Sequence, residues 1–416
     1  MSRLPLSFLF LSVLLFLLLD GTLTDSLQEG MRDLHSHFSL SLYQSVSSGL
    51  NQTNLIVSPL SVALSLGLLQ LGARGNTLAQ LEETLGYNVQ DPHVRDFLLF
   101  SGSSLNSSEG VKLLQTCSLL VHSSVLIQRD FLHSAASWFN VNVVQANLNQ
   151  SPRRDRPERR HDEPWPLSGG SSSGELSGSG DPQPSDSPWW PSRVQMALVN
   201  TVSFRGTWQK QFVFTHTQNL PFLLSDGTTI KVPMMHQASD VRFGQFRAGS
   251  EQRYTVLELP YLGQSLSLQL VLPSDRRSPL GPLEEQLGPR HLWSWDAGLR
   301  RTRMDIFIPR FKMQNRFNLK TVLPVMGISD AFNPSTADFS RISEEGLYVS
   351  DAFHDVRIEV TEDGTKAAAA TAMVLLKRSR APVFKADRPF LFLLRHSKTG
   401  SILFMGRVMN PVDQSS

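Results

Sequence analysis

The sequence is poor in the residues on which metal sites, disulfide frameworks and many enzyme active sites depend. Its 416 residues include one cysteine, Cys117, so no disulfide can form within the chain. The 11 histidines are scattered, and no Cys-x-x-Cys pair, His-Glu-x-x-His motif or phosphate-binding loop occurs. We therefore expect no metal, no cofactor and no catalytic residues.

An excess of charge of one sign is also missing. The formal net charge is +2, from 39 basic and 37 acidic residues, which is too small to indicate nucleic acid or a membrane surface as a partner. A hydrophobic content of 40% and a charged content of 18% are typical of a soluble globular protein with a large core. Such a core does not need disulfides, and the apolar neighbours of Cys117 predict a buried, unreactive thiol.

Long hydrophobic runs are absent except at the N-terminus. The uncharged, Leu-rich run from Leu4 to Leu19 is shorter than the roughly 20 residues of a membrane-spanning helix. Small residues follow it, so we predict a signal peptide over residues 1–24, cleaved near Gly21 or Thr24, with a signal anchor as the alternative. Secretion to the extracellular space is therefore expected. Glycosylation acceptors would then be Asn51, Asn106 and Asn149.

Apolar periodicity predicts helices in the N-terminal part of the chain. Apolar residues recur every three to four positions over residues 27–49, which predicts a helix ending at Gly49. Ser58 is placed to cap a second helix, with Pro59 at its first position. Residues 62–72 are apolar nearly all round, so we expect this second helix to be buried.

The later part of the chain mixes strands with short helices. Strand-like runs cover residues 194–204, 303–309 and 346–361, and a helix is predicted over 317–326. Helices and strands without a regular βαβ alternation indicate the α+β class. No internal repeat occurs, and a chain of 416 residues could form two average domains or one large one.

Residues 151–192 interrupt this pattern. They contain 8 Pro, 5 Gly and 10 Ser without apolar periodicity. Such a composition cannot bury enough apolar surface to offset the entropy of ordering, so we predict a low-complexity, disordered segment. The run Gly170–Gly174 formally matches a nucleophile elbow, but neither a strand before it nor a helix after it is predicted, so we assign it no function.

A run of small residues near the C-terminus leads into a basic segment. The run ends in four alanines and Thr371, and the basic segment is Lys377-Arg378-Ser379-Arg380. By intrinsic propensity alone the alanines would form a helix. The basic segment could by itself be a solvated turn or a processing site, although Leu375 stands where a convertase usually requires a further Arg.

This stretch resembles the reactive-centre loop of the serpins, a family of serine protease inhibitors. The acidic, Gly, Thr and small-residue positions of the family's hinge are filled by Glu362, Asp363, Gly364, Thr365, Ala367, Ala368, Ala369, Ala370 and Thr371. Counting on from this hinge places the scissile bond at Arg378–Ser379 within a loop over residues 362–382, with Lys377 or Arg380 as alternatives. The stretch 387–396 looks most like the clade E group of plasminogen activator inhibitor and glia-derived nexin.

The resemblance covers about residues 34–148 and 194–411 and implies a single domain over residues 25–416, interrupted by residues 151–192. It implies a serpin fold with three β-sheets, about eight helices and an exposed reactive-centre loop. Residues 151–192 stand where the family has a helix across the main sheet, so that helix is expected to be replaced. The residues where the main sheet would open are Ser58, Asn200, Trp208 and His354; taken alone, Trp208 and His354 would be interpreted as core residues.

The resemblance also implies a function. A secreted inhibitor would be attacked at Arg378 by a trypsin-like serine protease, with the plasminogen-activator type as one candidate, and would trap the acyl-enzyme by inserting its loop into the main sheet. The alternative is a non-inhibitory binding protein or a defective isoform, because the covering helix is missing. We expect a monomer, and no heparin site, since residues 91–105 carry only one basic residue, Arg95.

Overall fold

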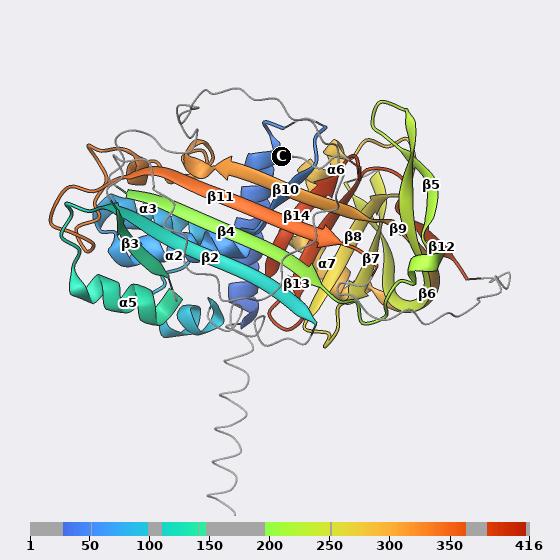
Figure 1. Ribbon diagram of the computed structural model, residues 1–416, viewed down its shortest axis with the longest axis horizontal. Helices are drawn as coiled ribbons and strands as arrows, with labels where there is room; N and C mark the ends of the chain where they lie inside the picture. Colours follow the sequence, from blue (N-terminus) through green and yellow to red (C-terminus); the bar gives the residue numbers. More distant parts are fainter. Residues whose placement is uncertain are drawn as a thin grey trace, which may run out of the picture.

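The computed structural model describes residues 28–50, 52–98, 110–139, 141–146, 196–249, 252–362 and 381–412. Within these ranges, fourteen strands form two hydrogen-bonded sheets and seven segments are α-helical (Figure 1). The fold is therefore α+β, as the sequence predicts. The predicted signal peptide, the segment 151–192 and residues 363–380 of the predicted loop lie outside the described residues.

The five-stranded sheet lies across the front of Figure 1 and has the order β10-β11-β4-β2-β3. Its two central strands, β11 and β4, are parallel, and His354 lies opposite Asn200. The outer neighbours β10 and β2 run antiparallel to β11 and β4, respectively. The strands are β2 (Val111–His122), β3 (Asn142–Ala146), β4 (Met196–Gly206), β10 (Phe311–Asn318) and β11 (Val349–Val360).

The nine-stranded sheet has the order β1-β14-β13-β8-β7-β6-β9-β12, with β5 on β6. The 20-residue strand β6 pairs with β5, β9 and β7 in turn, and so joins the second and third sheets of the expected fold into one. Its strands are β1 (Leu55–Val57), β5 (Gln218–Leu223), β6 (Thr229–Ala248), β7 (Gln252–Pro260), β8 (Leu266–Pro273), β9 (Arg300–Pro309), β12 (Val383–Lys385), β13 (Phe390–His396) and β14 (Ile402–Val408).

The helices pack around and behind the sheets. The predicted N-terminal helix is present over residues 28–47, and a further helical stretch covers 92–98. The left-handed Gly86 (φ 80°) ends α3, a conformation that glycine adopts without steric cost. The other helices are α2 (Pro59–Gly72), α3 (Gly75–Leu85), α5 (Arg129–Phe139), α6 (Gly281–Gln286) and α7 (Pro289–Gly298).

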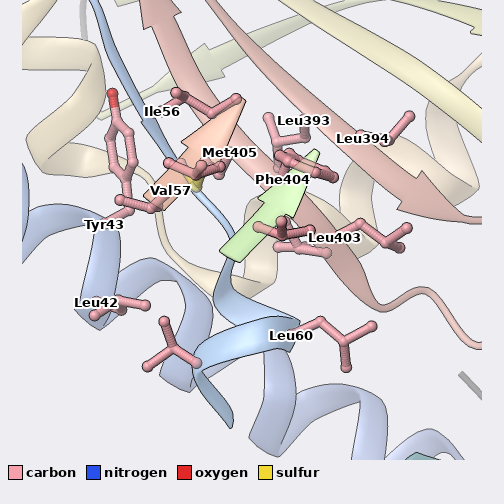
Figure 2. Packing of buried hydrophobic residues seen from close by; sticks show 14 of the residues in the cluster. Leu42, Tyr43, Ile56, Val57, Leu60, Leu393, Leu394, Leu403, Phe404 and Met405 are labelled. Atoms are coloured by element: carbon pink, nitrogen blue, oxygen red, sulfur yellow. The ribbon is translucent and has the colours of Figure 1, made fainter. Parts of the chain in front are cut away.

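Helix α2 lies in the middle of the core, as its apolar sequence predicts. Of its 14 residues only Leu64 is not buried. The helix contacts β4 and β2 of the five-stranded sheet and β14 of the other. Figure 2 shows the adjoining core, in which Tyr43 and Leu60 lie near the apolar residues of β1, β13 and β14. The same helix thus backs the centre of the five-stranded sheet.

Two local predictions differ from the structure. The helix predicted over 317–326 is wrong: β10 continues to Asn318, and a short 3-10 turn (Leu319–Thr321) follows. The reason is tertiary, because the Asn318 side chain donates to Asp351 at 2.7 Å and so holds the strand end against β11. Ser58 occupies the N-cap position of α2 but makes no capping bond; its hydroxyl donates to the Leu403 carbonyl at 2.6 Å instead.

Candidate functional site

A buried polar cluster joins α2 to the two central strands of the five-stranded sheet. The backbone N–H of Ser58 donates to Nε2 of His354 at 3.0 Å. Ser58 and His354 are 2% and 0% exposed. His354 and Asn200 face the same side of the sheet because they are register partners in adjacent strands. Three of the four residues predicted at the sheet opening therefore meet at one place.

The Asn200 side chain forms hydrogen bonds in this cluster with both the carbonyl oxygen and the NH₂ group of its amide. Its Nδ2 donates to the Ser61 carbonyl at 2.7 Å and to the Ser65 hydroxyl at 2.8 Å, and its Oδ1 accepts from the Ser61 hydroxyl at 2.5 Å. Cys117, opposite Asn200 in β2, places Sγ 3.2 Å from the Ser65 hydroxyl. Residues from β2, β4 and β11 are thus tied to α2.

His354 is held as a neutral imidazole. Since Nε2 accepts the Ser58 N–H, the neutral ring carries its proton on Nδ1. Burial lowers the pKa of His354 to about 4, with Asp355 opposing this in part. Among the described residues the buried Nδ1 has no hydrogen-bond partner. At neutral pH the ring therefore adds a polar contact without charge between β11 and α2.

Trp208 lies beside the C-terminal end of β11, away from the cluster at the middle of the strand pair. Its indole Nε1 donates to the carbonyl of Thr361 at 2.8 Å. The ring stacks on Tyr261 with centroids 4.3 Å apart, and it is 2% exposed. Trp208 thus fixes the backbone at the point where the predicted loop leaves the sheet.

The first residue of the predicted hinge, Glu362, is itself anchored. Its carboxylate accepts from the Thr217 hydroxyl at 2.8 Å and lies 3.7 Å from the Arg310 guanidinium. Its carbonyl accepts from the N–H of Phe212 at 3.2 Å. The side chain is 5% exposed. The described chain is therefore fixed up to Glu362, directly before the predicted loop.

The remaining predicted site residues lie outside the described residues. These are the hinge residues Gly364, Thr365, Ala367 to Ala370 and Thr371, the reactive bond Arg378–Ser379, and the glycosylation acceptors Asn51, Asn106 and Asn149.

The outer face of the five-stranded sheet exposes large apolar side chains. Leu114 in β2 is 71% exposed and Val144 in β3 is 41% exposed. Leu114 points away from α2, because it lies three residues from Cys117, whose Sγ contacts the helix, and side chains alternate between the two faces of a strand. Val144 faces the same way as Leu114, because its register partner Leu120 also lies three residues from Cys117. Exposed apolar residues on a sheet face are the surface that an amphipathic helix covers.

Sequence reasoning missed several partners of the site. Ser61 and Ser65 are spaced four residues apart on an otherwise apolar helix, which is a signal for two polar groups on one buried face. Thr217 and Arg310 carry no such local signal. Cys117 fits its prediction in part: it is half-buried, and burial raises the pKa of its thiol to about 11, so it is unreactive at neutral pH.

Comparison with known proteins identifies the family. A profile described as Serpin (serine protease inhibitor) matches residues 33–157 and 187–411. The chain belongs to the serpin family. The sequence described as "Probable serpin E3" from Danio rerio is 52% identical to this chain over 398 residues, which cover 93% of this chain and 94% of that protein.

Relatives of this serpin include nexins, members of the group that the sequence resembles. Glia-derived nexin from Mus musculus is 32% identical over 388 residues, covering 92% of this chain and 94% of that protein. The crystal structure of native protease nexin-1 with heparin superposes with a TM-score of 0.75 at 28% identity, covering 92% of this chain and all of that one. The serpin fold and the similarity to clade E are therefore confirmed.

These findings support a serine protease inhibitor, and they assign no catalytic activity. No helix within the described residues is long and apolar enough to cross a membrane. Within the same ranges, no group of three His, Cys, Asp or Glu side chains is placed to hold a metal ion.

Proposed function

We propose that this serpin is a secreted inhibitor of trypsin-like serine proteases that acts once. A protease attacks the Arg378–Ser379 bond, and the Arg378 carbonyl becomes an ester of the protease serine while Ser379 leaves with a new amino terminus. Arg378 suits an acidic primary pocket, which holds a long cation. The loop then inserts between β4 and β11 and carries the protease with it.

The topology of the five-stranded sheet is the observation that carries this proposal. β11 leads directly to the hinge, and its neighbour β4 runs parallel to it. A chain that turns back after β11 and enters between the two strands runs antiparallel to both. Insertion would therefore replace one parallel ladder by two antiparallel ladders, and antiparallel pairing is slightly more stable per residue.

The hinge composition supports the same step. A central strand buries alternate side chains beneath the sheet, and the alternate residues Thr365, Ala367, Ala369 and Thr371 are small or β-branched. No proline occurs in this run, so every residue could donate to a ladder. The anchored Glu362 would serve as the pivot, because its side chain is fixed before insertion begins.

Strands β4 and β11 must separate before the loop can insert between them, and the buried cluster opposes this separation. Ser58, Asn200 and His354 connect α2 to both central strands, so they are the contacts that must rearrange. Neutral hydrogen bonds contribute only about 0.5–1.5 kcal/mol each, so they can hold the native state without preventing its conversion. We assign these residues, with Trp208, to control of sheet opening.

A second candidate rests on the outer face of the sheet. Leu114 and Val144 are exposed there, and residues 151–192 lack the pattern of an amphipathic covering helix. A serpin without that helix could be a non-inhibitory binding protein or a defective isoform. This alternative predicts cleavage of the loop without trapping.

Heparin binding and oligomerisation are not part of the proposal. Arg95, the one basic residue of the segment 91–105, lies 5.0 Å from the Trp138 ring centroid and 3.9 Å from Asp96. A single cation with these contacts does not form a polyanion site. We propose a heparin-independent monomer.

The test is to incubate the purified chain with trypsin, thrombin, urokinase or plasmin and to run a denaturing gel. A band of the summed mass indicates a covalent complex and supports inhibition. The matched control is Arg378→Ala, which should lose the complex with Arg-specific proteases. Wild-type cleavage at Arg378–Ser379 without any complex would reject the inhibitor and favour the second candidate.

A further inference from the structure

A cavity of about 480 Å³ lies where β13 begins and β14 ends, at the nine-stranded sheet. It is lined by the turn between β5 and β6, the loop from β8 to α6, and the beginning of β13 and the end of β14. The volume falls within the range of small-molecule sites, about 300–1,000 Å³. None of the residues that we assign to inhibition contributes to it, so the cavity needs its own explanation.

The walls of the cavity are largely apolar. Leu223 and Leu224 come from the β5–β6 turn, Leu280 and Pro282 from the start of α6, and Met409 from the segment after β14. Gly281 also lines the space, and no atom lies within 4 Å of the position that a side-chain carbon would take there. An apolar part of a ligand would contact these walls.

The polar side of the cavity is rich in arginine. Four guanidinium groups line it, and a single lining carboxylate, Glu284, accompanies them. Arg407 is already committed, because it donates to Glu284 at 3.0 Å and to the Leu50 carbonyl. The other three are Arg276, Arg277 and Arg388.

One buried carboxylate forms ion pairs with several cations beside the cavity. Asp387, whose side chain is 5% exposed, lies 2.9 Å from Arg388, 2.6 Å from Arg276 and 4.0 Å from Lys385. Arg388 is largely desolvated, which lowers its pKa, and its neighbour Arg276 lowers the pKa further. Asp275 is a second carboxylate beside this group: it raises the pKa of Arg388 and accepts from the backbone N–H of Arg277 at 3.1 Å. With Arg277 counted, four cations face these two carboxylates, which leaves an excess of positive charge beside the cavity.

Arg277 lies at the mouth of the cavity, and its guanidinium forms no ion pair with the described residues. Its side chain is exposed, and no carboxylate among the described residues lies within ion-pair distance of its guanidinium. A guanidinium binds a carboxylate or sulfonate with two parallel hydrogen bonds. The cavity thus combines apolar walls with an uncommitted cation at its entrance.

We propose that this cavity binds an amphipathic organic anion, such as a medium-chain fatty carboxylate. The carboxylate pairs with Arg277 and Arg276 at the mouth, and the alkyl chain lies along Leu223, Leu224 and Leu280. The site is independent of the reactive loop, so its test does not depend on protease inhibition.

The test uses decanoate titrated into the full-length chain by calorimetry, below the concentration at which decanoate forms micelles. We expect saturable binding with one site, about tenfold weaker binding for decanol, and none for acetate. In Arg277→Glu the affinity should fall about tenfold or more. Arg290→Glu, the same charge change at an exposed position of α7, should bind as the wild type does.

A second variant tests the cavity without a change of charge, because Arg277→Glu could also weaken binding through long-range electrostatics. Gly281→Trp fills the cavity, and binding should be lost while the melting temperature stays within a few degrees of the wild type. Three results would overturn the proposal: no saturable binding of decanoate, equal affinity for decanol, or unchanged binding in both folded Arg277→Glu and folded Gly281→Trp.

Discussion

Acidification tests the buried histidine at the centre of the five-stranded sheet. Burial lowers the pKa of His354 from 6.5 to about 4, so the folded protein disfavours protonation that the unfolded chain accepts. The stability from the neutral ring is fully present above pH 6.5, and it is lost as the pH falls from 6.5 to 4. The two pKa values give a loss of about 2 kcal/mol at pH 5 and about 3 kcal/mol below pH 4.

His35 must be included in the calculation. Burial also lowers its pKa to about 4, so it adds a loss of about 2 kcal/mol at pH 5. His35 and His354 together should cost the wild type about 4 kcal/mol between pH 7.4 and pH 5, and His354→Gln should lose about 2 kcal/mol less than the wild type. Burial also lowers the pKa of His236 and His396, and both residues are the same in the two proteins. The Gln amide oxygen can still accept the Ser58 N–H, so the substitution removes the titration rather than the contact.

The assay is denaturant unfolding of the wild type and His354→Gln at both pH values. The comparison uses the change with pH, because the substitution also alters absolute stability. His133→Gln, at an exposed position of α5, is the control and should behave as the wild type. Equal acid sensitivity of His354→Gln and the wild type would refute the reasoning.

Three further substitutions test other parts of the proposed site. Asn200→Ala removes the acceptor of the buried Ser61 hydroxyl and the donor to the Ser65 hydroxyl, and should cost about 2–4 kcal/mol in unfolding experiments, with faster loss of inhibitory activity on warming. Trp208→Phe removes the bond to the Thr361 carbonyl and should cost about 1–2 kcal/mol; an unchanged melting temperature would contradict this. Thr365→Arg should turn the inhibitor into a substrate, which a gel shows as cleavage without complex, because an arginine cannot be buried beneath the sheet.

The elements with a strong local pattern could be predicted from the sequence. The N-terminal helix and the buried α2 follow from apolar periodicity, and β4 and β11 follow from apolar strand-like runs. The segment around Asn318 could not be predicted, because its side chain is held by Asp351 of another strand. Local propensity favours a helix there, and tertiary contact decides against it.

The contacts within the buried cluster could not be predicted from the sequence. The resemblance names Ser58, Asn200 and His354, while only the register of β4 with β11 shows that two of them are opposite partners. The bond from Trp208 to Thr361 likewise depends on where β11 ends. Such contacts join residues far apart in the sequence, so no local pattern records them.

A reversible disulfide between β4 and β11 tests loop insertion most directly. Ser203 and Arg357 are register partners on the outer face, and neighbouring strands lie about 4.8 Å apart, within reach of a disulfide. The variant carries Ser203→Cys, Arg357→Cys and Cys117→Ser, so that only the new pair can oxidise. We expect the oxidised protein to be cleaved by trypsin at Arg378 without complex, and the reduced protein to form the covalent complex. If the oxidised protein formed as much complex as the reduced protein, insertion between β4 and β11 would be contradicted.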